Sequence, residues 1–220
     1  QDLIGAQGKL TEEVRAAIER AATVTEVDDI YRPFRPKRKT RASVARERGL
    51  EDLAILLFAQ EKSYTPSIEE QAARFVDPER EVPDVAAALQ GAMDIVAEEV
   101  SDNADYRREL RRLTFDAGSL TSKAAKEEDS VYAMYYDFSE PLRKLPGHRI
   151  LAINRGEKEK MLSATVLLDR ELALPLLRRA VVKPGSAAME FIKSACEDAY
   201  DRLIYPSLER EARSDLTERA

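Results

Sequence analysis

The chain has 220 residues, of which 44% are hydrophobic and 35% are charged, and its net charge is −6. A single cysteine, Cys196, excludes an intramolecular disulfide and a thiolate metal cluster, and a single histidine, His148, excludes a multi-histidine metal site. No apolar run approaches the roughly 18 residues of a membrane-spanning helix and no secretory signal opens the sequence, so we expect a soluble, cytoplasmic protein. Because the sequence begins at Gln1 and ends within a helical pattern, we expect it to be part of a longer protein.

Helical periodicity dominates the sequence and predicts a mainly α-helical fold, an irregular multi-helix array with at most one short pair of strands. Thr11 and Thr40 are typical N-caps, and Ser67 with Glu70 three residues later forms a capping-box pattern. The clearest amphipathic segment is 85–100, whose apolar residues fall within one sector of a helix. In chain order, we expect helices from Thr11 through Ala21, over 25–31, from Thr40 to Gly49, over 50–60, from Ser67, over 85–100, 102–116 and 127–136, from Ser139, and over 148–159, 186–204 and 207–220.

Prolines and alternating apolar residues mark the breaks between these helices. Pro33 and Pro36 bracket a stretch that we expect to be extended, because each proline disfavours a helical conformation in the residue before it. Weak alternation of apolar residues over 162–168 indicates a strand whose partner the sequence does not reveal. We expect Asp102 to cap the helix that follows it and Pro206 to divide the last two helices.

Positive charge is concentrated in one part of this acidic chain, since residues 32–48 include eight Lys or Arg residues and one acid. The candidate phosphate contacts in the basic segment, which we define as residues 35–41, are Arg35, Lys37, Arg38, Lys39 and Arg41. Their cationic groups could displace counterions from a nucleic acid, and the neighbouring Phe34 could stack on a base. The alternative interpretation is a solvated connector whose arginines pair with acids elsewhere and whose Phe34 and Tyr31 pack into the core.

The expected helix 102–116 is a second basic feature, because its apolar residues share one side and its arginines cover the other. The candidate phosphate contacts on this helix are Arg107, Arg108, Arg111 and Arg112. A helix that packs by one edge and presents a basic face suits the recognition helix of a helix-turn-helix unit. The alternative is a solvated face on which Asp105 and Glu109 offset part of the charge, and the face offers no Asn, Gln or Ser for base readout.

The remaining candidate sites are weaker, and each has a simpler structural interpretation. Lys183–Ser186 could bind an anion but is more typical of a helix cap, and Glu127–Asp129 could bind a hard cation but is more typical of a solvated face. His148 has no nucleophile at a known spacing, and Cys196 is typical of a small buried residue. No nucleotide-binding, hydrolase or zinc motif is present, so we expect no catalytic residue, no metal and no cofactor.

Six segments together resemble the N-terminal region of the Tex family of bacterial transcription accessory proteins. They are 10–19 (LTEEVRAAIE), 29–42 (DIYRPFRPKRKTRA), 45–54 (ARERGLEDLA), 136–142 (YDFSEPL), 148–159 (HRILAINRGEKE) and 198–211 (DAYDRLIYPSLERE). The segments follow one another in family order along nearly the whole chain. One departure is Lys160, near which the family pattern leads us to expect a glycine.

The resemblance implies an N-terminal helical region (1–66), a helix-turn-helix-like unit (67–118) and a helical continuation of the scaffold (119–220). In the family, an RNase-H-like domain, helix-hairpin-helix motifs and an RNA-binding OB-fold domain follow this region. The implied function is a non-catalytic scaffold that binds RNA or DNA weakly, with the absent C-terminal domains and the transcription machinery as further partners and no membrane. The alternative is a protein–protein interaction module that docks those domains or that machinery.

Overall fold

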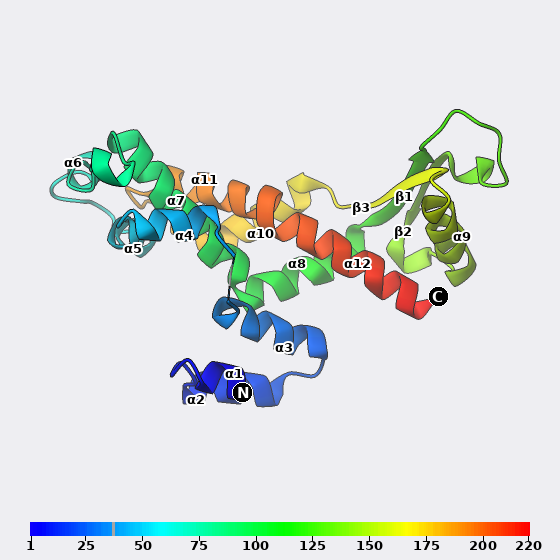
Figure 1. Cartoon of the computed structure of the whole chain (residues 1–220), viewed down its shortest axis with the longest axis horizontal. Coiled ribbons are helices and arrows are strands. Elements are labelled where there is room, and N and C mark those ends of the chain that lie inside the picture. Colours follow the sequence, from blue (N-terminus) through cyan, green and yellow to red (C-terminus); the bar gives the residue numbers. More distant parts are fainter. Residues whose placement is uncertain (37) are drawn as a thin grey trace. The chain divides into compact units, whose positions relative to one another are not determined.

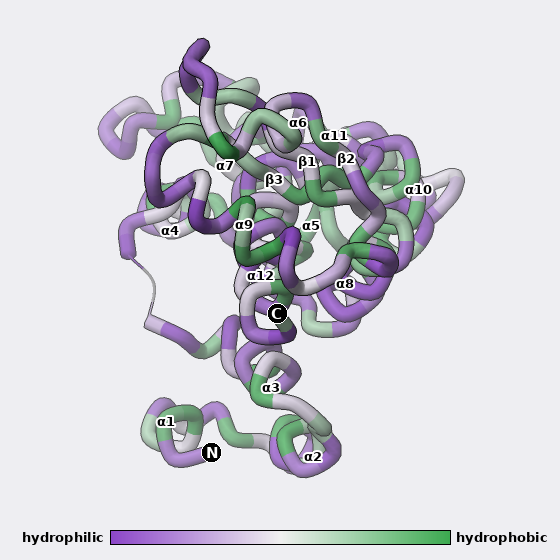
Figure 2. The backbone as a smooth tube through the Cα atoms, turned by 90° about the vertical axis from the view of Figure 1, so that its right-hand side faces the viewer, coloured by the Kyte–Doolittle hydropathy of each residue, from purple (hydrophilic) through white to green (hydrophobic). Residues whose placement is uncertain are grey.

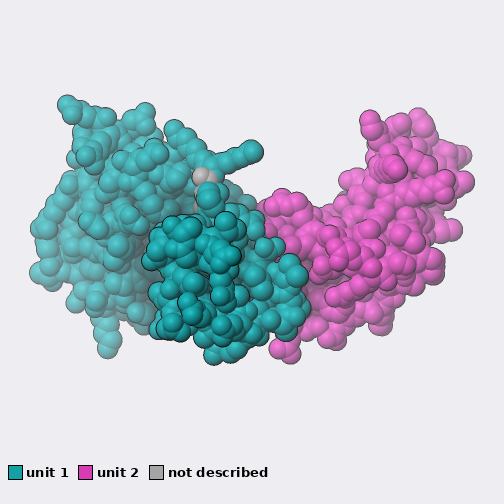
Figure 3. Space-filling view, turned by 60° about the horizontal axis from the view of Figure 1, so that its bottom comes forward, with its two compact units in different colours: residues 1–108, 177–203 teal, residues 109–176, 204–220 magenta. Residues whose placement is uncertain are grey.

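The computed structural model describes residues 1–36 and 38–220, which form two compact units (Figure 3). Unit 1 comprises residues 1–108 and 177–203, and unit 2 comprises residues 109–176 and 204–220. The bounds of these units differ from those of the predicted segments 1–66, 67–118 and 119–220. The division of the chain into those three segments remains a prediction. None of the helices in the described chain combines the length and the apolar composition needed to cross a lipid bilayer.

Unit 1 is helical, which confirms the mainly α-helical class for this part of the chain. Its α-helices are α1 (Asp2–Gly5), α2 (Glu12–Arg20), α3 (Val24–Tyr31), α4 (Arg41–Glu47), α5 (Glu51–Ala59), α6 (Ile68–Ala73), α7 (Val85–Asp102) and α11 (Met189–Asp198), with the first residues of α8 (Ala104–Ala117) and the last residues of α10 (Arg170–Val181). Short 3-10 helices lie at Arg32–Phe34 and Pro78–Arg80.

Helix α7 is the centre of unit 1, and α4, α5, α6 and α11 pack against it (Figure 1). Small residues permit this packing, because Ala88 and Ala92 are fully buried on α7. At Gly91, a Cβ atom would lie only 2.3 Å from Cδ1 of Leu50, so the start of α5 contacts the backbone of α7 directly. The helix predicted at 85–100 is confirmed, but neighbours cover it on several sides rather than in a single sector.

The predicted capping residues start the helices of unit 1. The hydroxyl of Thr11 accepts a hydrogen bond from the backbone N–H of Val14, and Thr40 and Ser67 each begin a complete capping box. Gly49 has a φ of +81°, the left-handed conformation expected just after the helix that Thr40 begins. These local signals act over three or four residues, so they are visible in the sequence.

Unit 2 contains an antiparallel sheet of order β2-β1-β3, formed by β1 (Ser119–Ala124), β2 (Asp137–Pro141) and β3 (Leu162–Leu167). Helices α9 (Gly147–Lys158) and α12 (Tyr205–Arg219) pack against β3 (Figure 1). The register places Leu120 of β1 opposite Val166 of β3, and both side chains are buried in the core together with Ile153 of α9. The predicted strand at 162–168 is therefore confirmed, and its missing partner is β1.

Several predictions of local structure in unit 2 are wrong. The span 127–136 holds only the 3-10 helix Ala133–Tyr135, and Ser139 lies within β2 rather than at the start of a helix. The helical turn after β2 is the 3-10 helix Leu142–Lys144. The sheet of the described chain thus has three strands, where the sequence predicted at most one pair.

Two prolines also behave differently from the prediction. Pro33 lies within the 3-10 helix Arg32–Phe34 instead of an extended stretch, because the ring holds φ near the value that a helical turn needs. Pro206 does not divide two separate helices, since a π-helical segment (Ala199–Ile204) connects α11 to α12. The proline is the second residue of α12, the helix that directly follows this π-helical segment.

Candidate nucleic-acid interface

Helix α8 carries the four predicted arginines and is preceded by Asn103, whose side chain caps its first turn. The Oδ1 atom of Asn103 accepts hydrogen bonds from the backbone N–H groups of Asp105 and Tyr106. The predicted cap, Asp102, is instead the last residue of α7. Leu110 is fully buried, so the helix has the apolar packing edge that the sequence predicted.

Arg107 does not lie on the exposed face of α8, so the exposed placement that the sequence predicted for it is wrong. The residue is 1% exposed, because it precedes Leu110 by three residues and Thr114 by seven and shares their buried side of the helix. Its Nε lies 3.4 Å from Oδ1 of Asp29 on α3, and its Nη1 donates a hydrogen bond to the carbonyl oxygen of Ser101. The buried pair neutralises both charges inside unit 1 and leaves no group within reach of a phosphate in solvent.

The other three arginines of α8 lie beside carboxylates. The pairs are Arg108–Asp105 at 2.9 Å, Arg111–Glu211 at 3.0 Å and Arg112–Asp116 at 3.9 Å. Partly exposed pairs such as these contribute only about 0–1 kcal/mol, so a phosphate could replace the carboxylate. Because each arginine already has an acidic neighbour, however, the exposed face of α8 has little excess positive charge.

The basic segment begins at Arg35, whose guanidinium is partly engaged by α3. Its Cζ atom lies 5.6 Å from the centroid of the Tyr31 ring, and its Nη2 lies 3.4 Å from Oδ1 of Asp28. Phe34 and Tyr31 are both half-buried. The alternative interpretation, in which these two rings pack inward, therefore agrees with the structure better than a ring that is free to stack on a base.

The rest of the basic segment is exposed and positively charged. Arg38, Lys39 and Arg41 are all exposed, whereas the predicted contact Lys37 lies outside the described residues. Among the residues that the structure describes, no ion pair joins Arg38 or Lys39 to a carboxylate. Of the two basic features predicted from the sequence, the basic segment thus keeps more positive charge available to a phosphate.

Helix α4 fixes the far end of the basic segment. The hydroxyl of Thr40 accepts a hydrogen bond from the backbone N–H of Ser43 and donates one to Oε2 of Glu98 on α7. Burial raises the pKa of Asp94 on α7, and the positive charge of Arg41 opposes that rise. The segment therefore leads into a helix that is both capped and hydrogen-bonded to the centre of unit 1.

The weaker candidates have structural roles. The hydroxyl of Ser186 accepts a hydrogen bond from the N–H of Ala188, and the Nζ of Lys183 donates one to the carbonyl oxygen of Ala59. The N-cap of α11 is Ala188, which makes no side-chain cap bond, so Ser186 is not the predicted cap of this helix. Burial raises the pKa of the Cys196 thiol to about 12, so the reactive thiolate is scarce at neutral pH. Within the described chain, no group of three His, Cys, Asp or Glu side chains is arranged to hold a metal ion.

Comparison with known proteins gives one family and several relatives. A family model described as Tex central region-like matches residues 63–220. The chain is similar to the uncharacterized protein YdcI of Bacillus subtilis, with 39% identity over 99% of this chain and 31% of that protein. Identity is 40% to protein tex of Bordetella pertussis, over 82% of this chain and 23% of that protein. It is 31% to the transcriptional accessory protein Tex of Neisseria gonorrhoeae, over 97% of this chain and 29% of that protein, so the chain spans less than a third of each relative.

Proposed function

The chain belongs to the Tex family, and from this premise we propose that it is a non-catalytic helical scaffold of a transcription accessory protein. In this proposal the scaffold contacts nucleic acid through the basic segment. The remaining domains of the longer protein and the transcription machinery are further partners in the proposal. Helices α6, α7 and α8 occupy the span 67–118, where we propose a helix-turn-helix-like unit.

The exposure of Arg38, Lys39 and Arg41 is the observation that carries the proposal. Among the described residues, Arg38 and Lys39 form no ion pair with a carboxylate, so they gain most from meeting phosphates, because binding releases the counterions condensed on the nucleic acid. Phosphate contacts position a protein without reading sequence, and the basic segment has no Asn or Gln to bind base edges. We therefore expect weak binding that depends strongly on salt and little on sequence.

A titration of labelled single-stranded RNA, single-stranded DNA and duplex DNA with the fragment at several salt concentrations tests the proposal. The test variant carries Arg38→Gln and Lys39→Gln, and the matched control carries Arg108→Gln and Arg112→Gln, so each loses two positive charges. Log affinity falls as log salt rises, and each phosphate contact contributes about 0.7–0.9 to the steepness of that fall. We therefore expect the slope of the test variant to be less steep by about 1.5. The control should keep nearly the slope of the unaltered protein, because the arginines that it loses already face carboxylates.

The other outcomes of this titration contradict the proposal in different ways. Equal losses in both variants would show a general charge effect, and a loss confined to the control would assign phosphate contact to α8. An absence of binding even at low salt would favour the second candidate function, a protein–protein interaction module. The observation that favours that second candidate is the pairing of the α8 arginines with carboxylates, which leaves this face little excess charge for a polyanion.

A further inference from the structure

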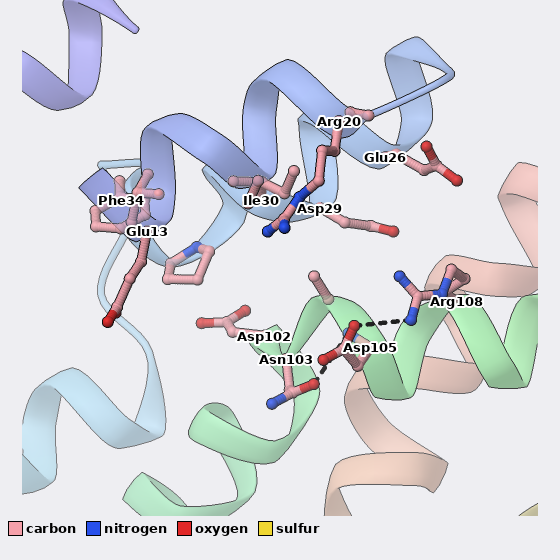
Figure 4. Close-up of a pocket in the computed structure, with 15 residues that line it drawn as sticks. Glu13, Arg20, Glu26, Asp29, Ile30, Phe34, Asp102, Asn103, Asp105 and Arg108 are labelled. Carbon is pink, nitrogen blue, oxygen red and sulfur yellow. Dashed lines mark hydrogen bonds and ion pairs between the residues drawn. The ribbon is translucent and has the colours of Figure 1, made fainter. Parts of the chain in front are cut away.

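Unit 1 contains a groove of about 840 Å³ that the proposed nucleic-acid contact does not use. Helices α2 and α3 and the 3-10 helix Arg32–Phe34 form one wall, and the junction between α7 and α8 forms the other (Figure 4). Phe34 and Glu13 lie near one end of the groove, and Arg108 lies near the other (Figure 4). Two helical walls with an open groove between them are typical of a site that accepts a peptide helix.

The wall formed by α2 presents apolar side chains that the rest of unit 1 covers only in part. Helix α2 is amphipathic, as its alternating polar and apolar residues show in Figure 2, yet none of its residues is fully buried. Val14 and Ala17 of this helix and its C-cap residue, Ala21, line the groove, and Ile30 and Phe34 extend the apolar surface. An amphipathic helix in a protein gains most of its stability by packing its apolar face against other residues. The apolar face of α2 is only partly packed in this way, because the helix has no buried residue.

The groove is also acidic. Five carboxylates and two guanidinium groups line it: Glu13, Glu26, Asp29, Asp102 and Asp105, with Arg20 and Arg108. Arg108 is already paired with Asp105, and the charge of Asp29 is compensated from behind by Arg107. Of the other charged groups on the lining, Glu13 and Glu26 outnumber Arg20, so the groove repels a phosphate backbone and attracts a cationic partner.

From this combination we propose that the groove binds a basic amphipathic peptide segment of a protein partner. The apolar side of the partner's helix packs on Val14, Ala17 and Phe34, and its Lys or Arg side chains meet the carboxylates at the rim. This is the helix-in-groove mode of recognition, in which apolar anchors spaced three or four residues apart provide contact area and flanking charges set orientation. The interaction surface is separate from the basic segment and opposite to it in charge, so either proposal can fail without the other.

Fluorescence anisotropy with a model peptide tests this inference on the whole fragment. The probe is a fluorescein-labelled peptide of Leu and Lys residues, about 14 residues long and therefore about four helical turns. A peptide with Glu in place of each Lys is the control ligand. We expect saturable binding of the Leu/Lys peptide that weakens with added salt, and no binding of the Leu/Glu peptide.

Two charge reversals on α2 locate the binding site. Glu13 lines the groove, whereas Glu19 is an exposed residue of the same helix outside the groove, so Glu13→Lys and Glu19→Lys change the net charge equally. We expect Glu13→Lys to weaken binding by about fivefold or more and Glu19→Lys to change it by less than about twofold, because a charge at the rim acts at contact distance. Circular dichroism of both variants confirms that each remains folded.

Hydrogen exchange with and without the peptide provides an independent readout. We expect the bound peptide to slow exchange in α2 and around residues 102–108. Equal weakening by both charge reversals, equal binding of the two peptides, or protection elsewhere in the chain would each overturn the proposal. Displacement of the peptide by RNA from this groove would also overturn it, since the carboxylates would then not exclude phosphates.

Discussion

At the scale of single residues, Lys160 has a backbone conformation that L-amino acids rarely adopt. Its φ is +59°, and it follows Glu159, the C-cap residue of α9. The N–H of Lys160 donates to the carbonyl of Glu157 and the N–H of Met161 to that of Gly156, which is the hydrogen-bond pattern of a Schellman motif. Glycine is preferred at this position because it has no Cβ to clash, so the glycine that the family pattern favours near Lys160 has a physical reason.

We predict that Lys160→Gly stabilises the protein. A left-handed conformation costs a residue with a Cβ roughly 1–2 kcal/mol, and glycine removes this cost. Glycine also has more conformational freedom in the unfolded chain, which offsets part of the gain. We therefore expect the free energy of unfolding to rise by about 1 kcal/mol. The matched control is Lys158→Gly at the last residue of α9, which should lower the free energy of unfolding by less than the roughly 1 kcal/mol that glycine costs in a helix interior. Urea denaturation measures both variants, and a loss of stability in Lys160→Gly would contradict the explanation.

At the scale of helices, the packing of α5 on α7 depends on the absence of a side chain at Gly91. Alanine is the better helix former by about 1 kcal/mol, so propensity alone predicts that Gly91→Ala is stabilising. Packing predicts the opposite, because the new Cβ would lie 2.3 Å from Cδ1 of Leu50, which is itself buried and has little room to move. Overpacking of this kind costs about 1–3 kcal/mol, and it should therefore outweigh the gain in propensity.

The prediction for Gly91→Ala is thus a net loss of roughly 1 kcal/mol in the free energy of unfolding, measured by urea denaturation. A double-mutant cycle separates the two effects. In a Leu50→Ala background the clashing atoms are absent, so the same Gly91→Ala change should be neutral or stabilising. A similar loss in both backgrounds would show that contact with Leu50 is not the cause.

At the scale of the whole molecule, the sequence predicted features that depend on near neighbours and missed those that depend on distant ones. The caps at Thr11, Thr40 and Ser67 act over three residues, and the sequence predicted all three correctly. Strand β1 was missed because its sequence, SLTSKA, has little apolar alternation and becomes a strand by pairing on both sides with β2 and β3. Its partners lie on both sides of α9 in the sequence, where local patterns carry no information about pairing.

The candidate site shows the same division. The exposed charges of the basic segment are predictable, because a run of Lys and Arg rarely becomes buried. The burial of Arg107 is not, because it depends on Asp29, a residue of another helix nearly eighty positions earlier. One signal was present in the sequence: Arg107 shares the spacing of Leu110 and Thr114 on α8, so its place on the apolar edge could have been recognised.

The uneven burial of the helices predicts an order of local stability across unit 1. Helices α2 and α5 both have nine residues, but α2 has no buried residue and α5 buries Leu53, Ala54 and Leu57. Burying one leucine contributes about 1.5–3 kcal/mol, so opening α5 should cost at least about 3 kcal/mol more than opening α2. A difference of that size corresponds to roughly a 100-fold slower exchange of backbone amides in α5.

Hydrogen exchange followed by mass spectrometry measures this difference on peptides covering 12–20 and 51–59. Equal protection of the two helices would mean that contacts with the rest of unit 1 hold α2 as firmly as the core holds α5. The expected weak protection of α2 would instead mean that its apolar face is available to a partner. Because a ligand that binds only the closed helix adds its binding free energy to the cost of opening, the basic amphipathic peptide should slow exchange in α2 and leave α5 unchanged.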